Sequence, residues 1–305
     1  MLATLLIRIK ILGFWKGVCT FILGYSYHLK NINLPLSRRL LYTKHQVILD
    51  FISKLTKNPP ALKCKKEMDD NVIWVLWWQG EDNMPPIVRA SVNSINKNKG
   101  DFRLQLLDSN NINDFIEIPV FIMNKVGKGM SYAHLADYIR LRLLATYGGL
   151  WIDSTFLVTS KIPGYINKYP WYTIRSRNEF YYCISNYRWA INFMYFKKGN
   201  SFAYDLLGIF ESYWAQYNEA VDYFILDYSV YWLLTHNKQY AMDYSNIPYS
   251  NPECFDGLML KMNNLFDQKE FEEMLGRTWA HKLSYRIDIK QLPNSFYSYI
   301  IDNYK

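Results

Sequence analysis

The chain has 305 residues, half of them hydrophobic and 20% charged, which is enough for one large globular domain with or without a small appendage. Residues 1–66 contain twelve basic residues and one acid, Asp50, whereas the rest of the chain contains 23 basic and 26 acidic residues. The net charge of +8 therefore belongs to the N-terminal segment, and a body without a basic excess argues against a nucleic-acid partner. Four cysteines without a C-x-x-C pair indicate a reduced, cytoplasmic chain without disulfides or structural zinc.

The N-terminal segment is apolar as well as basic, and Arg8, Lys10 and Lys16 interrupt its apolar stretches. Those stretches are far shorter than the ~20 residues of a membrane-spanning helix, and no small-residue cleavage site follows them. Apolar residues recur at helical spacing: Leu2, Leu5, Leu6, Ile9 and Leu12. We expect a helical arm that lies on an anionic membrane surface, at the inner face of the cell membrane, or that packs on the protein's own body.

An Asn-Pro-Pro sequence at 58–60 and the Lys-rich stretch after it indicate a linker. We therefore expect an arm at 1–66 and a catalytic domain at 67–305. Strands are expected in this domain at 72–78, 101–108, 150–153, 171–175 and 191–196. Helices are expected at 86–97, 131–147, 201–217 and 221–236. The alternation of strands and helices predicts an α/β fold with a mostly parallel central sheet.

Two predicted strands end in polar residues that follow tryptophans. Trp77 and Trp78 precede Gln79, and Trp151 lies two residues before Asp153. Ligands of open α/β sheets bind outside the carboxyl ends of the strands. If the two strands are parallel, their ends open into one crevice.

The helix predicted at 131–147 brings further polar groups toward this crevice. His134, Asp137 and Arg140 recur at three-residue spacing and share one face. The rest of the helix is apolar nearly all round, so we expect its polar face to border a cavity. No G-x-G-x-x-G follows the first strand and no G-x-x-x-x-G-K-[ST] occurs, which disfavours dinucleotide dehydrogenases and P-loop nucleotidases.

The pattern S-x₅-D-x₂-R-x₃-L-x₃-G-G-x-W-x-D, from Ser131 to Asp153, resembles the core signature of glycosyltransferase family 32 and its sugar-transferring relatives. More closely, the chain is similar to the bacterial capsular polysaccharide synthesis proteins. Four blocks carry this resemblance: WWQGEDNMPPIVRASVNSI (77–95), YGGLWIDST (147–155), VDYFILDY (221–228) and WAHKLSYR (279–286). The combination is specific, whereas no single block is.

The resemblance implies a GT-A fold and a retaining transfer of a hexose from a nucleotide sugar, with UDP-hexose as the favoured donor. The implied acceptor is a saccharide or lipid-linked saccharide of a growing capsular or other cell-surface polysaccharide. Asp137 and Arg140 would contact the donor sugar and ribose, and Asp153 would be the first acid of a D-x-D motif. The other implied donor-binding residues are Trp77, Trp78, Gln79, Gly148, Gly149, Ser154 and Lys282.

The resemblance also implies a divalent metal, Mn²⁺ or Mg²⁺, at Asp153, Thr155 and His281. Thr155 stands where the second acid of D-x-D, the usual direct metal ligand, would be, which puts the metal in question. A leaving nucleoside diphosphate needs positive charge nearby. Without a metal, that charge has to come from cationic side chains: Lys282, Arg140, Arg175 or Arg177.

The block at 221–228 contributes two acids, Asp222 and Asp227, either of which could position the acceptor hydroxyl or act as a base. The catalytic candidates are therefore Asp137, Arg140, Asp153, Asp222 and Asp227. Two other functions remain open on the sequence. One is a non-catalytic sugar- or nucleotide-binding relative, and the other is a nucleotidyl- or phosphotransferase with a similar sheet.

Overall fold

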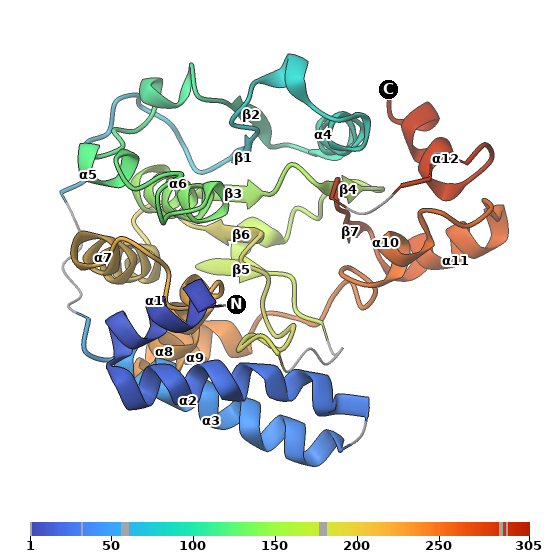
Figure 1. Ribbon diagram of the computed structural model, residues 1–305. Coiled ribbons are helices and arrows are strands. Elements are labelled where there is room, and N and C mark those ends of the chain that lie inside the picture. Colours follow the sequence, from blue (N-terminus) through green and yellow to red (C-terminus); the bar gives the residue numbers. More distant parts are fainter. Residues whose placement is uncertain (1, 32, 56–60, 177–181, 287–288, 291) are drawn as a thin grey trace.

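The computed structural model describes residues 2–31, 33–55, 61–176, 182–286, 289–290 and 292–305 (Figure 1). Its centre is a five-stranded sheet in the order β2-β1-β3-β6-β5. The strands are β1 (Val72–Leu76), β2 (Arg103–Leu107), β3 (Gly149–Ile152), β5 (Trp171–Thr173) and β6 (Phe193–Phe196). β1 is parallel to β2 and β3, whereas β6 is antiparallel to both β3 and β5. Four of the five strands therefore point the same way, which confirms the predicted α/β fold with a mostly parallel sheet.

β1 and β3 lie side by side at the centre of this sheet, and their close approach depends on a double glycine. Gly149 has a φ of 95°, and a Cβ added there would lie 2.7 Å from the carbonyl oxygen of Val72. Gly148 also has a positive φ, and its carbonyl oxygen accepts a hydrogen bond from the Trp74 indole at 2.9 Å. Glycine is therefore required where the chain enters β3.

The four predicted helices of the body are present as α4 (Pro86–Asn98), α6 (Tyr132–Tyr147), α7 (Ser201–Gln216) and α8 (Ile225–His236). Ser131 caps α6 by accepting a hydrogen bond from the backbone N–H of His134 at 3.2 Å. α6 packs against α7, and α7 packs against α8 (Figure 1). Most side chains of α6 are buried, charged ones included, which agrees with the expectation that its polar face borders a cavity.

The helix predicted at 221–236 begins four residues late, at Ile225, so its predicted start was wrong. The side chain of Asp222 accepts the backbone N–H of Phe224 at 3.1 Å, and this local bond holds residues 221–224 in a turn. An aspartate can satisfy a nearby backbone N–H in a turn as well as at a helix start, which is why the sequence left this boundary ambiguous.

A second, two-stranded sheet was not predicted. β4 (Phe156–Val158) follows β3 directly and pairs antiparallel with β7 (Ala280–Lys282). This pairing brings residues 279–286 beside the end of β3. The remaining helical elements are η2 (Glu81–Asn83), η3 (Ile112–Asp114), α5 (Val120–Met123), η4 (Ile166–Lys168), α9 (Lys238–Ser245), α10 (Gly257–Lys261), α11 (Gln268–Arg277) and α12 (Phe296–Asn303).

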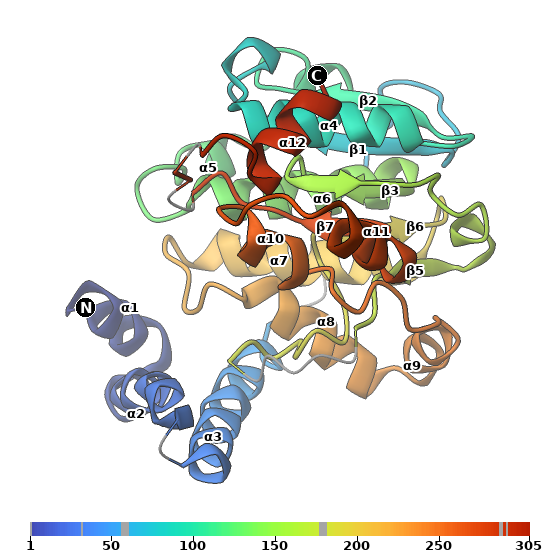
Figure 2. The same cartoon turned by 90° about the vertical axis from the view of Figure 1, so that its right-hand side faces the viewer.

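The N-terminal arm is helical, as expected, and consists of α1 (Leu2–Leu12), α2 (Phe14–Gly24), η1 (Tyr25–Asn31) and α3 (Leu34–Ile52). Figure 2 shows these helices gathered at one end of the body, where α3 packs against α8. Within the described part of the chain, every helix is too short or too polar to cross a bilayer. Residues 58–60 of the predicted linker lie outside the described residues.

Candidate functional site

A pocket of about 540 Å³ opens at the carboxyl ends of β1 and β3. Its lining comes from segments far apart in the chain: the ends of β1 and β3 and the residues after them, the first half of α6, residues 183–192, the start of α8 and the turn before it, residues 255–259, and the end of β7 with the chain after it. A pocket of this size is in the range of small-molecule and cofactor sites. The crevice expected outside the strand ends is therefore present.

Asp153 follows the last residue of β3 and lies at the centre of the pocket's charged groups. Its Oδ1 accepts hydrogen bonds from the Trp151 indole at 2.8 Å and from Arg140 Nη2 at 3.0 Å, and its Oδ2 accepts one from Lys282 Nζ at 3.0 Å. Burial acts to raise the pKa of this carboxyl, but Lys282 and Arg140 outweigh burial and hold the pKa below its usual value. Asp153 is therefore ionised at neutral pH.

Arg140 joins the helix side of the pocket to the strand side. Its Nη1 lies 3.0 Å from Asp137 Oδ1, and its guanidinium lies 5.0 Å from the ring centroid of Trp151. The Nε of Arg140 is buried and makes no hydrogen bond with the described residues. Burial raises the pKa of Asp137, and the Arg140 charge offsets part of that effect. The predicted convergence of Asp137 and Asp153 is thus mediated by one arginine.

Lys282 reaches this group from β7 and also donates a hydrogen bond to Thr155 Oγ1. Side chains alternate along a strand, so the preceding residue, His281, faces the opposite way. His281 is fully buried and does not line the pocket. Burial lowers the pKa of His281 to about 4, so its ring is neutral. The structure therefore separates the predicted pair His281 and Lys282.

The side chains present do not fit a divalent ion held by the protein alone. The described residues contain no cluster of three or more His, Cys, Asp or Glu side chains that could hold a metal. Asp153 and Thr155 are the predicted ligands that reach the pocket, and both already contact the Lys282 ammonium. Mg²⁺ takes roughly six oxygen ligands, so any such ion would need most of them from a nucleotide diphosphate and water.

The predicted donor-binding residues divide into two groups. Trp77, Trp78, Gln79 and Ser154 line the pocket. The ring of Trp77 meets that of Tyr285 edge-on, with centroids 5.3 Å apart. Gly148 and Gly149 lie at the other end of β3 and do not line the pocket, so the structure gives them a backbone role and not a contact with a ligand there.

The two acids of the block at 221–228 have different surroundings. Asp227 lines the pocket, is 3% exposed, and accepts a hydrogen bond from the Trp189 indole at 3.0 Å. Burial, together with the nearby Asp137 charge, raises the pKa of Asp227 to about 8. Asp222 does not line the pocket and pairs instead with Arg8 and Lys44 of the arm.

The other predicted cations are not part of the pocket as described. Arg175 donates to the backbone oxygens of Tyr244 and Ile247 and does not line it. Arg177 lies outside the described residues.

Several pocket residues could not be singled out from the sequence. Asn192 precedes β6, its backbone oxygen accepts the N–H of Asp153 at 3.0 Å, and its buried side-chain oxygen makes no hydrogen bond within the described residues. Tyr223 and Tyr285 also line the pocket. The chain has 26 tyrosines, so residue type alone does not distinguish these two from tyrosines of the core. Only their position within the blocks at 221–228 and 279–286 indicates that they belong to the site.

Comparison with known proteins adds three findings. Residues 30–300 match the family model described as capsular polysaccharide synthesis protein. Over 95 residues the chain is 32% identical to the O-glycosyltransferase braB of Annulohypoxylon truncatum, a match that covers 28% of this chain and spans only 23% of that relative's length. A solved structure, PaToxG Glycosyltransferase, is similar over 79% of this chain and 93% of its own, with 11% identity and a TM-score of 0.36, which is too low to support a conclusion.

Proposed function

Because the chain belongs to the capsular polysaccharide synthesis protein family, we propose that it is a glycosyltransferase that moves a hexose from a nucleotide sugar to a growing cell-surface polysaccharide. The observation that carries this proposal is the group formed by Asp153, Arg140 and Lys282 at the end of β3. These residues lie in a pocket of about 540 Å³ and belong to the segments that resemble sugar transferases.

The leaving group of such a transfer is a nucleoside diphosphate, which departs with several negative charges. Arg140 and Lys282 each bind the Asp153 carboxylate at 3.0 Å and are fixed in position before a ligand arrives. Charge-assisted hydrogen bonds from these two groups to diphosphate oxygens would stabilise the departing anion. The aromatic edge formed by Trp77 and Tyr285 offers a surface for the base, and UDP-hexose is the donor we favour.

Asp227 also lines the pocket, and it is the group we propose for the acceptor. The acceptor hydroxyl oxygen forms the new bond to the anomeric carbon, the bond from that carbon to the diphosphate breaks, and Asp227 takes the hydroxyl proton. A pKa of about 8 suits this step, because a base works best when its pKa lies near the working pH. The acceptor is a saccharide or lipid-linked saccharide. Retention of configuration is part of the proposal, and it requires the acceptor oxygen to approach on the face of the sugar from which the diphosphate leaves.

A divalent ion enters this proposal only together with the nucleotide. Since the chain offers Asp153 and Thr155 and little else, we expect weak binding of Mn²⁺ or Mg²⁺ to the free protein and tighter binding once a diphosphate adds its oxygens. The ion would add to the positive charge that Arg140 and Lys282 already supply at this place.

The arm is proposed to bring the enzyme to an anionic membrane surface, where a lipid-linked acceptor would lie. The exposed apolar side chains of α1 and α2 support this placement: Leu2, Leu6, Phe14, Trp15 and Ile22. Trp15 is 81% exposed and is followed by Lys16. Apolar side chains beside lysines and arginines are typical of segments that lie on anionic lipid.

The proposed function is tested by a thermal-shift panel of UDP, GDP, CMP and ATP, each with and without Mn²⁺. A ligand at a hundredfold excess over its Kd stabilises the folded protein by about 2.7 kcal/mol, which is easily seen. We expect one diphosphate to stabilise the protein, more so with Mn²⁺. The shift should be lost in Lys282→Met and kept in the control Lys161→Met, whose lysine forms an exposed pair with Asp101.

The other outcomes separate the alternatives. No shift with any nucleotide in a folded sample contradicts the proposal. If a nucleotide binds but no nucleoside diphosphate is released from any nucleotide sugar, a non-catalytic binding protein is favoured. Consumption of a nucleoside triphosphate with release of inorganic diphosphate favours a nucleotidyltransferase.

A further inference from the structure

We propose that the N-terminal arm holds one wall of the pocket in place, and that Asp222 is the positioning residue through which it does so. This wall consists of the pocket-lining residues within 183–192 and 223–227, and it includes Asp227. The inference rests on the proposed function only for the substrate that this wall meets. The claim that the arm holds this wall rests on contacts between the arm and residues 182–228 alone.

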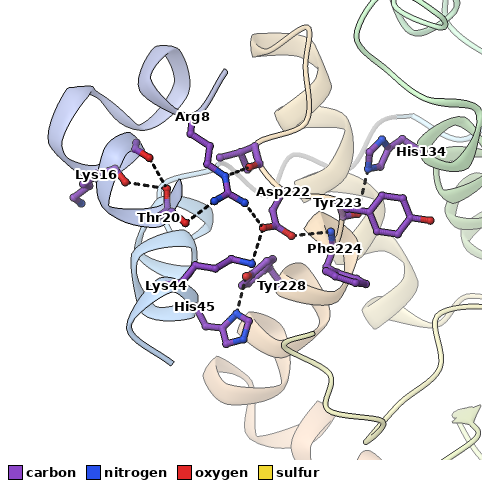
Figure 3. A network of polar contacts seen from close by, with 12 residues as sticks. Arg8, Lys16, Thr20, Lys44, His45, His134, Asp222, Tyr223, Phe224 and Tyr228 are labelled. Carbon is purple, nitrogen blue, oxygen red and sulfur yellow. Dashed lines mark hydrogen bonds and ion pairs between the residues drawn. The ribbon is translucent and has the colours of Figure 1, made fainter. Parts of the chain in front are cut away.

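The arm is joined to the body by a buried ion network around Asp222 (Figure 3). Asp222 Oδ2 lies 3.0 Å from Arg8 Nη2 and 2.9 Å from Lys44 Nζ, and the side chains of Asp222 and Lys44 are 4% and 1% exposed. Arg8 also donates to the carbonyl oxygens of Thr20 at 2.5 Å and Val221 at 3.3 Å. One acid of the body thus binds cations from both α1 and α3.

The same aspartate shapes the turn that lines the pocket. Its Oδ1 accepts the N–H of Phe224 at 3.1 Å, and both Tyr223 and Phe224 line the pocket. On the other side of the turn, the carbonyl oxygen of Tyr223 lies 3.2 Å from His134 Nε2 of α6 (Figure 3). The turn is therefore held between the arm and α6, and Asp227 follows it in the first turn of α8.

Two further contacts tie the arm to this wall. His45 Nδ1 of α3 lies 2.7 Å from the hydroxyl of Tyr228, the residue after Asp227. The ring of Tyr182 packs against Tyr27 of the arm at 4.9 Å and lies 5.1 Å from Lys44 Nζ. Tyr182 precedes Cys183, the first residue of the other pocket segment on this side. The arm therefore contacts both segments of the wall from behind.

The charges of this network predict how its variants differ. Arg8→Met leaves Lys44 and Asp222 as a neutral pair, and Lys44→Met leaves Arg8 and Asp222 as one, so both variants keep a balanced interior. Asp222→Asn leaves two buried cations facing each other without an acid, which is far more costly. Burial acts to raise the pKa of Asp222, but Lys44 and Arg8 hold it below its usual value, so the acid is charged in the folded protein.

The test uses the full-length protein and compares Arg8→Met and Lys44→Met with a matched control, Lys10→Met. Lys10 lies on the same helix as Arg8 and pairs with Glu219 of the body at 2.9 Å, but this pair is on the surface. Hydrogen exchange is measured by mass spectrometry on peptides from 182–192, 221–228, β1 and α6. We expect at least tenfold faster exchange in 182–192 and 221–228 for the two network variants, unchanged exchange in β1, and no change in Lys10→Met.

Kinetics provide the readout that a loss of general stability would not give. The donor is a nucleotide sugar that carries the nucleotide identified by the ligand panel and that supports turnover by the wild type. We expect Arg8→Met to lower kcat about tenfold or more while the KM for this donor stays within twofold, because the donor side of the pocket is untouched. Unchanged exchange at 221–228 in both network variants, or equal changes across the whole chain, would overturn the inference. Exchange is measured without any substrate, so the inference can fail or hold independently of the proposed function.

Discussion

Asp153 gathers two cations of the pocket on one carboxylate, and its removal is the most direct test of the pocket's chemistry. In Asp153→Asn, Lys282 and Arg140 lose their common anion, so Arg140 keeps only Asp137 and Lys282 keeps only Thr155 to hold it for a departing diphosphate. We expect sugar transfer to fall at least about 100-fold, as for the loss of a preorganised electrostatic group. The measurement is product formation under saturating donor.

The control for this variant is Asp108→Asn. Asp108 follows the neighbouring parallel strand β2, caps its own loop through the N–H groups of Asn110 and Asn111, and does not line the pocket. It should keep near-normal transfer. A folded Asp153→Asn protein with the same rate as this control would remove Asp153 from the mechanism.

Asp227 links the pocket to the pH dependence of stability. Its pKa is about 8 in the folded protein but near 4 when unfolded, so between these values the unfolded chain has released a proton that the folded protein retains. The free energy of unfolding therefore decreases as pH rises from about 4 to 8, by up to about 1.4 kcal/mol per pH unit from this group. The contribution is constant below and above this window.

Asp227→Asn should remove that dependence, since an amide stays neutral and its oxygen can still accept the Trp189 indole N–H. We expect this variant to equal the wild type in stability near pH 4, to exceed it increasingly up to pH 8, and to lose transfer by about 10²–10⁴-fold. Urea unfolding at pH 5, 6.5 and 8 measures the first effect. Parallel pH profiles for the two proteins would contradict the assignment.

At the scale of single elements, the entry to β3 leaves no room for a side chain. Gly149→Ala would place a Cβ 2.7 Å from the Val72 carbonyl oxygen at a φ of 95°. We expect a loss of roughly 2–4 kcal/mol in the free energy of unfolding, from backbone strain and overpacking together. Gly276→Ala in α11 is the control, because a Cβ there meets nothing within 4 Å, and it should be neutral or slightly stabilising.

Elements with a strong local pattern could be predicted from the sequence, and those that depend on distant partners could not. α4 and α6 were predicted almost to the residue because proline or serine marks each start and the apolar pattern is long. β4 and β7 have three residues each and exist through pairing with each other, which no local window records. The predicted start of α8 was wrong because the side chain of Asp222 holds residues 221–224 in a turn.

The site residues can likewise be divided into those that a local pattern predicts and those that depend on distant contacts. The strand-end acid and the helix pair, Asp153 with Asp137 and Arg140, follow from spacing within one strand and one helix. The orientation of His281 depends on which face of β7 meets the pocket, and β7 was not predicted. The role of Asp222 depends on Arg8, which is 214 residues away in the chain, so no local pattern indicates it.

For the whole molecule, the basic charge and the exposed apolar side chains of the arm predict that the protein binds to anionic membranes. In flotation with liposomes that contain anionic lipid, we expect the protein to rise with the vesicles at low salt and to be released as salt increases. The double variant Phe14→Ser with Trp15→Ser should reduce binding at least tenfold, because both rings are mostly exposed.

Tyr249→Ser is the matched control for this assay, since Tyr249 is also about half exposed but lies outside the arm. It should float like the wild type. Equal flotation of the arm variant and this control, or equal binding to neutral lipid, would show that the arm serves the body alone.

The distance along the chain between Arg8 and Asp222 also sets an order of events during synthesis. At roughly 5–20 residues per second, the ribosome makes Asp222 about 10–40 s after Arg8. Throughout that interval the arm carries its basic and apolar side chains without the acid that later receives them. The arm helices are therefore made before the body and seated after most of it, and a nascent chain stalled before residue 222 presents a free cationic arm to any anionic surface nearby.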